Sequence, residues 1–162
     1  MNWQALVPET RLQGHMLGIK IFVEAQTFEM SGGLSEAAFW VGLRQEIYSA
    51  MMNHQSIALP LGNCLVDRSV GPADDFGWAN RAVVHCADVL NCCFGSAGVA
   101  LSHWKELKDY SDQWKQSAPS SFAPIFQRRP DREQGEVFPE IWYSMACHSK
   151  FSVASRATYL KF

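Results

Sequence analysis

The chain lacks an excess of charge of either sign. Its 14 lysines and arginines stand against 16 aspartates and glutamates, which gives a formal net charge of −2 at pH 7. Lysine and arginine contacts to phosphates supply most non-specific affinity for nucleic acid, so this balance gives no general attraction to DNA or to anionic membranes. The sequence holds no basic cluster larger than the doublet Arg128-Arg129. We therefore expect no direct sequence-specific DNA binding by this chain.

Long hydrophobic runs are also missing. No window holds the ~18–20 uninterrupted apolar residues of a membrane span, and the first residues, Met1 to Gln4, lack the basic start of a secretory signal. The cysteines are odd in number and follow no repeating spacing; they are Cys64, Cys86, Cys92, Cys93 and Cys147. Free thiols in a reducing compartment are the expected state. We therefore expect an intracellular protein, nuclear or cytoplasmic, without membrane association.

The patterns that carry catalysis or metal binding are not found either. A structural zinc site needs four ligands, usually with a Cys-x₂₋₄-Cys element, and the cysteine spacing does not supply one. The doublets His85-Cys86 and Cys147-His148 cannot form activated thiols, because adjacent helical residues point about 100° apart. A long-range couple of Cys92 with His148 stays open. We expect no enzymatic activity, no cofactor and no metal.

What the chain does contain is enough apolar side chains for a core. With 48% hydrophobic and 19% charged residues over 162 positions, it fits one domain, which buries roughly 70% of its unfolded surface. Helical periodicity interrupted by glycine and proline predicts an all-α array of about five helices with long loops. The predicted helices are 14–30 (a strand is the alternative), 35–53 capped by Ser35, one from Asp74 or Asp75 to Phe94, one after Ser102 and one from Pro139. An extended excursion is predicted over 119–139, where prolines recur.

The segment from Phe39 to Asn53 spreads its apolar side chains over a wide arc. A step of 100° per residue places six of them within about 120°: Phe39, Trp40, Leu43, Ile47, Ala50 and Met51. Three more extend the arc past half the circumference: Val41, Tyr48 and Met52. This breadth predicts a helix buried on most sides. Arg44 falls on the packed side, whereas Gln45 and Glu46 fall toward the other.

Arg44 is the candidate binding group of that segment. Trp40 and Tyr48 lie one turn away on either side, so the guanidinium can stack on Trp40 and bridge to a neighbouring helix. One interpretation makes the three residues an anchor for an anionic ligand; the other, which we favour, makes Arg44 a satisfied polar tie between helices. Further aromatic residues could line a pocket, although such a stripe is more often core. They are Trp104, Tyr110, Trp114, Trp142 and Tyr143.

Three separated stretches resemble one protein family. They are Ala38–Tyr48 (AFWVGLRQEIY), then Trp104–Leu107 (WKEL) with Tyr110 and Trp114, then Ser121–Phe126 (SFAPIF) leading to Phe138–Trp142 (FPEIW) and Cys147-His148. In this order they resemble the fungal-specific transcription factor domain, the helical regulatory region downstream of the binuclear zinc-cluster DNA-binding module. The resemblance covers roughly residues 14–148 of a single domain, 1–162, and leaves a divergent tail at 149–162. Its motifs are structural rather than catalytic.

Two departures from the family limit what the resemblance implies. Family members read DNA through a short N-terminal segment with six closely spaced cysteines and many basic residues. This sequence has no such segment, so no zinc ligand or DNA-contacting residue is assigned. After Cys147-His148 the family continues with a long aliphatic helix, whereas this chain continues with a different pattern. We therefore expect a fragment that arises from truncation, alternative splicing or a gene model outside the true frame.

Together these observations favour a regulatory or interaction domain of fungal transcription regulation. Such a domain receives a signal from a protein partner or a small-molecule effector and passes it to a DNA-binding module. One alternative is a helical small-molecule-binding protein or enzyme with a pocket near Arg44 and the Trp/Tyr cluster. The other alternative is a non-functional truncated fragment.

Overall fold

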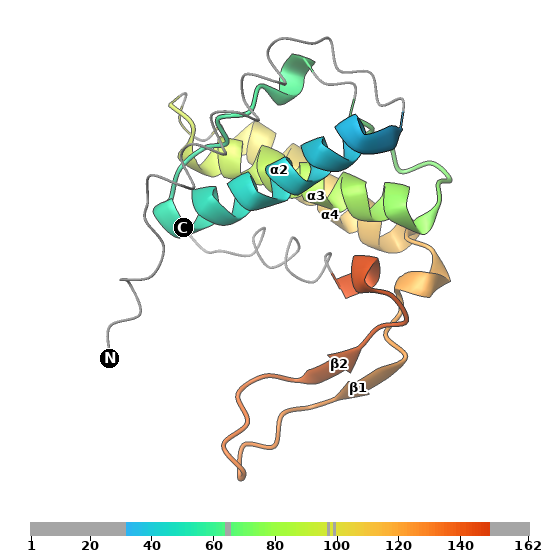
Figure 1. The fold of residues 1–162 in the computed structure, drawn as a ribbon. Helices are drawn as coiled ribbons and strands as arrows, with labels where there is room; N and C mark the ends of the chain where they lie inside the picture. The colour runs from blue at the N-terminus through green and yellow to red at the C-terminus, as the bar shows by residue number, and fades with distance from the viewer. Residues whose placement is uncertain (1–31, 64–65, 97, 99, 150–162) are drawn as a thin grey trace. The chain divides into compact units, whose positions relative to one another are not determined.

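The computed structural model describes residues 32–63, 66–96, 98 and 100–149, and these residues are mostly helical (Figure 1). In chain order the elements are helix α2 (Gly33–Asn53), the 3₁₀ helix η2 (Leu61–Asn63), helices α3 (Asp75–Phe94) and α4 (Leu101–Ser117), the 3₁₀ helix η3 (Ser120–Phe122), and strands β1 (Phe126–Arg128) and β2 (Glu140–Trp142). Residues 146–149 are again helical. The predicted helix 14–30 and the tail beyond residue 149 lie outside the described residues.

Contacts divide the chain into two compact units. Unit 1 comprises Met1–Val66 with Leu90–Gly98, and unit 2 comprises Asp67–Val89 with Val99–Phe162. Helix α2 lies in unit 1, helix α4 and both strands lie in unit 2, and α3 contributes residues to both. The predicted site residues divide in the same way, because Arg44 belongs to unit 1 and the Trp/Tyr cluster belongs to unit 2.

Helix α2 confirms the predicted second helix but begins earlier than expected. It starts at Gly33, after Gly32 with a φ of 84°, and no side chain caps its first turn. The prediction that Ser35 is the N-cap is therefore wrong. Glu36 has the nearest equivalent role, since its Oε2 accepts the N–H of Gly32 at 2.9 Å. The helix ends at His54, whose left-handed backbone conformation lets the next N–H, that of Gln55, donate to the carbonyl of Ala50 at 3.0 Å.

Only one side of α2 is buried. Its buried residues are Phe39, Gly42, Leu43, Glu46, Ile47 and Ala50. Three apolar residues that were expected to widen this face are exposed instead: Val41, Tyr48 and Met52. The prediction of a helix buried on most sides is therefore wrong. The buried face is centred about one residue step away from the expected arc, which brings Glu46 inside.

Helix α3 begins where the sequence predicted and is buried around most of its circumference. The carboxylate of Asp74 accepts the N–H of Gly77 at 2.7 Å, which is the bond of an N-cap. Arg81, His85 and Cys92 are buried together with the apolar residues of the helix. At the C-terminus a Cβ on Gly95 would collide with the carbonyl oxygen of Asn91, so only glycine fits this exit.

Helix α4 has the two-sided pattern expected of a surface helix. Leu107, Ser111 and Trp114 are buried, whereas the opposite side is exposed and carries Lys105, Lys108, Asp109 and Lys115. The helix begins at Leu101 after Ala100 without a side-chain cap. Ser102 lies inside its first turn, and the prediction of a cap at Ser102 is wrong.

An antiparallel hairpin follows α4 in unit 2. Phe126 pairs with Trp142, Gln127 with Ile141 and Arg128 with Glu140, and Figure 1 shows the strands side by side in a long, narrow loop of chain. The expected excursion after residue 119 is thus present, but the helix predicted from Pro139 is wrong. Glu140 is held by a cross-strand partner, Arg128, rather than by the positive end of a helix.

Candidate functional site

Arg44 and Trp40 are brought together as the sequence predicted, within their own helix. Arg44 Nη1 donates to the carbonyl of Trp40 at 2.9 Å, and the guanidinium carbon lies 5.7 Å from the centre of the Trp40 ring. Burial lowers the pKa of the Arg44 guanidinium. Tyr48, the third predicted member, is exposed. The ligand-anchor and helix-tie interpretations of Arg44 both remain predictions.

Glu46, not Arg44, is the charged residue at the centre of the buried face of α2. Its Oε1 accepts backbone N–H groups from Ala58 and Leu59, the latter at 3.0 Å, and Glu46 is 5% exposed. Asn91 Oδ1 accepts the preceding N–H, from Ile57, at 2.8 Å. Three successive loop N–H groups are thus satisfied by side chains of unit 1. The spacing Phe39, Glu46 and Ala50 could have indicated this position, because all three share one helix face.

A polar cluster lies in unit 2 around Arg81 of α3. Its Nε donates to Asp67 Oδ2 at 2.8 Å, its Nη1 donates to the carbonyl of Gly71 at 2.7 Å, and its guanidinium lies 4.9 Å from the ring centre of Trp78. Arg68 forms a second two-bond pair, with Asp88 at 2.8 and 3.0 Å. These bonds attach segment 67–71 to α3. All three nitrogens of the Arg81 guanidinium donate hydrogen bonds within unit 2.

Two rings beside this cluster keep unused polar atoms. His85 of α3 and Tyr110 of α4 lie with ring centres 4.8 Å apart, and neither His85 Nε2 nor Tyr110 Oη has a hydrogen-bond partner among the described residues. Burial lowers the pKa of His85 to about 4 and raises the pKa of Tyr110 to about 12. Both groups are therefore neutral at pH 7. A water molecule or a small neutral polar ligand is the kind of partner that would satisfy His85 Nε2 and Tyr110 Oη.

Three rings of the predicted aromatic cluster contact different partners. Trp114 packs edge-on against Trp78 at 5.5 Å and against Phe122 at 5.3 Å, whereas Trp142 packs on Phe126 across the hairpin at 5.5 Å. Tyr110 contacts His85 instead. Trp114 also donates its Nε1–H to the carbonyl of Trp78 at 3.2 Å. Trp114, Tyr110 and Trp142 thus pack on different side chains of unit 2, and a pocket lined by the cluster stays a prediction.

A row of side-chain hydrogen bonds links Asp75, at the start of α3, to three polar residues from later in the sequence. His148 Nδ1 is 3.1 Å from Ser144 Oγ and His148 Nε2 is 2.9 Å from Asp75 Oδ2, while Ser121 Oγ donates to Asp75 Oδ1 at 2.7 Å. Hydrogen bonds from Ser121 and then from His148 lower the pKa of Asp75. The order resembles a Ser–His–Asp triad, but the imidazole is buried and packs on Phe122 at 4.6 Å. We interpret these hydrogen bonds as a clamp that holds residues 144–149 to Asp75 of α3.

The four cysteines among the described residues are poorly placed for nucleophilic chemistry. Cys86, Cys92 and Cys147 are buried and Cys93 is partly buried, all as free thiols. Burial raises the pKa of Cys86 to about 11, which disfavours the reactive thiolate. Both nitrogens of His148 are bonded to Ser144 and Asp75, so this imidazole is not placed to activate Cys147. Within the described ranges no three His, Cys, Asp or Glu side chains come close enough to hold a metal ion.

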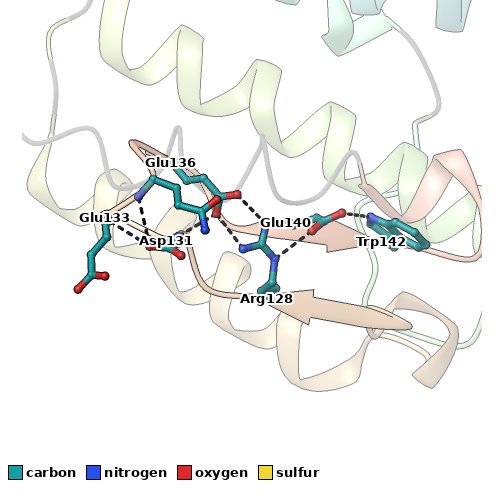
Figure 2. A network of polar contacts seen from close by, with 7 residues as sticks. Arg128, Asp131, Glu133, Glu136, Glu140 and Trp142 are labelled. Atoms are coloured by element: carbon teal, nitrogen blue, oxygen red, sulfur yellow. Dashed lines mark hydrogen bonds and ion pairs between the residues drawn. The ribbon is translucent and has the colours of Figure 1, made fainter.

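The hairpin forms an arm, residues 123–143, and one arginine at the loop end of the strand pair joins the strands to the loop (Figure 2). Arg128 Nη1 and Nη2 donate to the two carboxylate oxygens of Glu136 at 2.9 and 2.8 Å, and Nε donates to Glu140 at 3.1 Å. Glu140 also accepts the indole N–H of Trp142 at 3.0 Å. The hydrogen bond from Arg128 lowers the pKa of Glu136. This network orders an arm whose strands are only three residues long.

The arm exposes an unusual number of large apolar side chains. They are Ile125, Phe126, Val137, Phe138 and Trp142, and the most exposed are Val137 at 76% and Phe138 at 73%. The sequence interpretation did not single out this surface, although the alternation of apolar residues with prolines over 122–139 could have suggested it. Exposed apolar clusters of this kind mark sites of protein–protein contact.

Comparison with known proteins gives no match. No family model, no curated protein and no solved structure is similar to this chain. Among the described helices none is long and apolar enough to cross a membrane.

Proposed function

We propose that this chain is a regulatory interaction domain, similar to the middle region of fungal transcription regulators, and that its arm binds a partner protein. The observation that carries the proposal is the apolar surface of an arm already ordered by Arg128, Glu136 and Glu140. Pre-ordering lowers the entropic cost of binding, and exposed tryptophan and phenylalanine are common binding hot spots. The domain acts by contact rather than by catalysis, in the nucleus or cytoplasm.

The proposal includes an array of about five helices, in which helical residues from 146 onward take the place of the helix predicted from Pro139. In it, a helix over 14–30 and the helix that begins at residue 146 join α2, α3 and α4 to make about five. The arm is an addition to this all-α array. A DNA-binding module on another chain or segment supplies sequence recognition, and a partner or small-molecule effector supplies the signal.

A tethering experiment tests the role of the arm. The chain is fused to a heterologous DNA-binding module, and the output of a reporter gene is measured in fungal cells. The double variant Phe138→Ser, Trp142→Ser removes the two largest apolar contacts and is expected to lower the reporter response several-fold at equal protein level. Phe76→Ser is the matched control, because Phe76 is also an exposed aromatic residue but lies at the start of α3. An unchanged response in the arm variant contradicts the proposal.

A mobility-shift assay tests the absence of direct DNA recognition. The purified chain is expected to retard no DNA fragment in a sequence-selective way at physiological salt, because its net charge is −2 and it has no zinc-cluster cysteines. Sequence-selective retardation would contradict this part of the proposal.

A second candidate function, binding of a small neutral effector, is supported by the unused atoms of His85 and Tyr110. A thermal-shift screen of small polar metabolites is expected to find ligands whose effect is lost in Tyr110→Phe, which removes one hydroxyl without changing the ring. Loss of the effect in Arg44→Ala instead, with the fold intact, would favour the anchor predicted from the sequence. A shift unaffected by either substitution would contradict both sites.

A further inference from the structure

Helix α2 carries a straight exposed stripe on the side away from its buried face. Its six residues, which we call the α2 seam, are Leu34, Ala38, Val41, Gln45, Tyr48 and Met52. All six are exposed, and the four largest apolar ones are exposed by 55–87% of their area. The spacing alternates between four and three residues along the whole helix. This is the heptad spacing of a helix that pairs with another helix.

The chemistry of the seam is that of an interface rather than of a solvated face. No charged residue lies in it, and its single strongly polar member, Gln45, lies near the middle. Small residues flank it at Ser35 and Ser49, so another backbone can approach closely. An extended peptide or a small ligand would not follow a 3.5-residue repeat along a helix of 21 residues. The partner that fits is a second apolar helix.

We propose that the α2 seam pairs with the α2 seam of a second copy of this chain, in an antiparallel arrangement about a twofold axis. In this arrangement Leu34 faces Met52 of the other copy and Ala38 faces Tyr48. Val41 then faces Gln45, so each layer holds residues of comparable total volume. A parallel pair would instead set Tyr48 against Tyr48 and Ala38 against Ala38, which leaves a crowded layer and a hollow one. Self-complementarity of this kind is what a twofold interface requires.

The charges on and near the seam permit the pairing, although one of them is expected to weaken the dimer. The seam has no net charge, so it favours neither an acidic nor a basic partner over its own copy. Arg44 is the nearest charge, and it is turned back onto the carbonyl and ring of Trp40. Near the twofold axis the two Arg44 side chains approach each other, so their repulsion weakens the dimer without blocking it. The pairing is independent of the arm, which belongs to unit 2.

Sedimentation velocity of the full chain over about 1–100 µM tests the pairing. We expect a concentration-dependent monomer–dimer equilibrium. The double variant Val41→Glu, Tyr48→Glu is expected to raise the dimer Kd at least about tenfold, whereas Arg44→Gln is expected to lower it. Val137→Glu is the matched control, because it places the same charge at an exposed apolar position on the arm. Circular dichroism and a cooperative unfolding transition verify that each variant is folded.

Cysteine cross-linking tests the orientation. A mixture of Val41→Cys and Gln45→Cys chains is expected to form a disulfide-linked dimer on mild oxidation, beyond the background of the unsubstituted chain, whereas neither variant does so alone. Cross-linking of Val41→Cys with itself would overturn the antiparallel arrangement. A monomer at all concentrations, or a dimer unaffected by the seam variant, would overturn the proposal. Loss of unfolding free energy in a monomeric seam variant would also overturn it, by showing that the seam is covered within its own chain.

Discussion

The carboxylate of Glu46 on α2 holds the backbone N–H of Leu59 at 3.0 Å and also accepts the N–H of Ala58. A buried carboxylate is costly unless its oxygens are hydrogen-bonded, and here the loop backbone supplies the donors. The benefit is mutual, because Leu59 is itself buried and its N–H would otherwise be unsatisfied. The bond therefore fixes both the rotation of α2 and the path of the loop after it.

Removal of this carboxylate is expected to be one of the most destabilising single changes in unit 1. Glu46→Ala leaves two N–H groups without acceptors and is expected to lower the free energy of unfolding by about 3 kcal/mol. Glu46→Gln keeps one acceptor oxygen and is expected to cost about 1 kcal/mol. Urea denaturation followed by circular dichroism measures both. Glu133→Ala, at an exposed position of the arm, is the control; an equal loss there would contradict the argument.

The position of α2 could be predicted from the sequence, but its rotation could not. Apolar residues occur on two sides of this helix, one buried and one forming the exposed seam, so periodicity alone does not tell them apart. The wheel therefore placed Arg44 inside and Glu46 outside. What decides the rotation is the pair of bonds from Ala58 and Leu59, in the loop that follows α2, to the carboxylate of Glu46. Such bonds leave no periodic signal.

Stability is expected to fall with acid through His85. Burial lowers the pKa of His85 from 6.5 to about 4, so the unfolded chain takes up a proton below pH 6.5 while the folded chain does not until near pH 4. The contribution is fully present above pH 6.5 and is lost as pH falls, by about 3 kcal/mol at pH 4. Urea denaturation at several pH values measures the slope. His85→Phe should flatten it between pH 6.5 and 4, whereas His103→Phe, at an exposed position, should not.

The clamp formed by His148 is expected to hold residues 144–149 in place. His148→Ala removes the bonds to Ser144 and Asp75, and amide hydrogen exchange over 144–149 is expected to accelerate by at least about tenfold. Ser121→Ala removes a bond to Asp75 without touching the imidazole, so it is expected to have a smaller effect. Unchanged exchange in His148→Ala would contradict the clamp. Covalent labelling of Ser144 by a fluorophosphonate would show instead that the serine is an activated nucleophile.

Local signals predicted some boundaries of the helices and strands and missed others for identifiable reasons. The Asp74 cap and the exit at Gly95 depend on side-chain and backbone chemistry within four residues, and both were predictable. The strand at Glu140–Trp142 depends on Arg128 and Phe126, which lie across the hairpin. Pro139 suits the first turn of a helix and the start of a strand alike. The cross-strand partners decide between them.

Arg128 is expected to order the arm through its bidentate ion pair with the two carboxylate oxygens of Glu136. Arg128→Lys keeps the charge but cannot reproduce three directed bonds, so exchange of the amides over 131–142 should accelerate while that of α3 and α4 stays unchanged. Arg132→Lys is the matched control, because Arg132 lies on the same arm outside the carboxylate network. Hydrogen–deuterium exchange with mass spectrometry measures both variants. Equal acceleration in the two would mean that the short strands, rather than the arginine fork, hold the arm.

A rigid arm is also what binding through Phe138 and Trp142 requires, so Arg128→Lys should lower the tethered reporter response without altering either aromatic side chain.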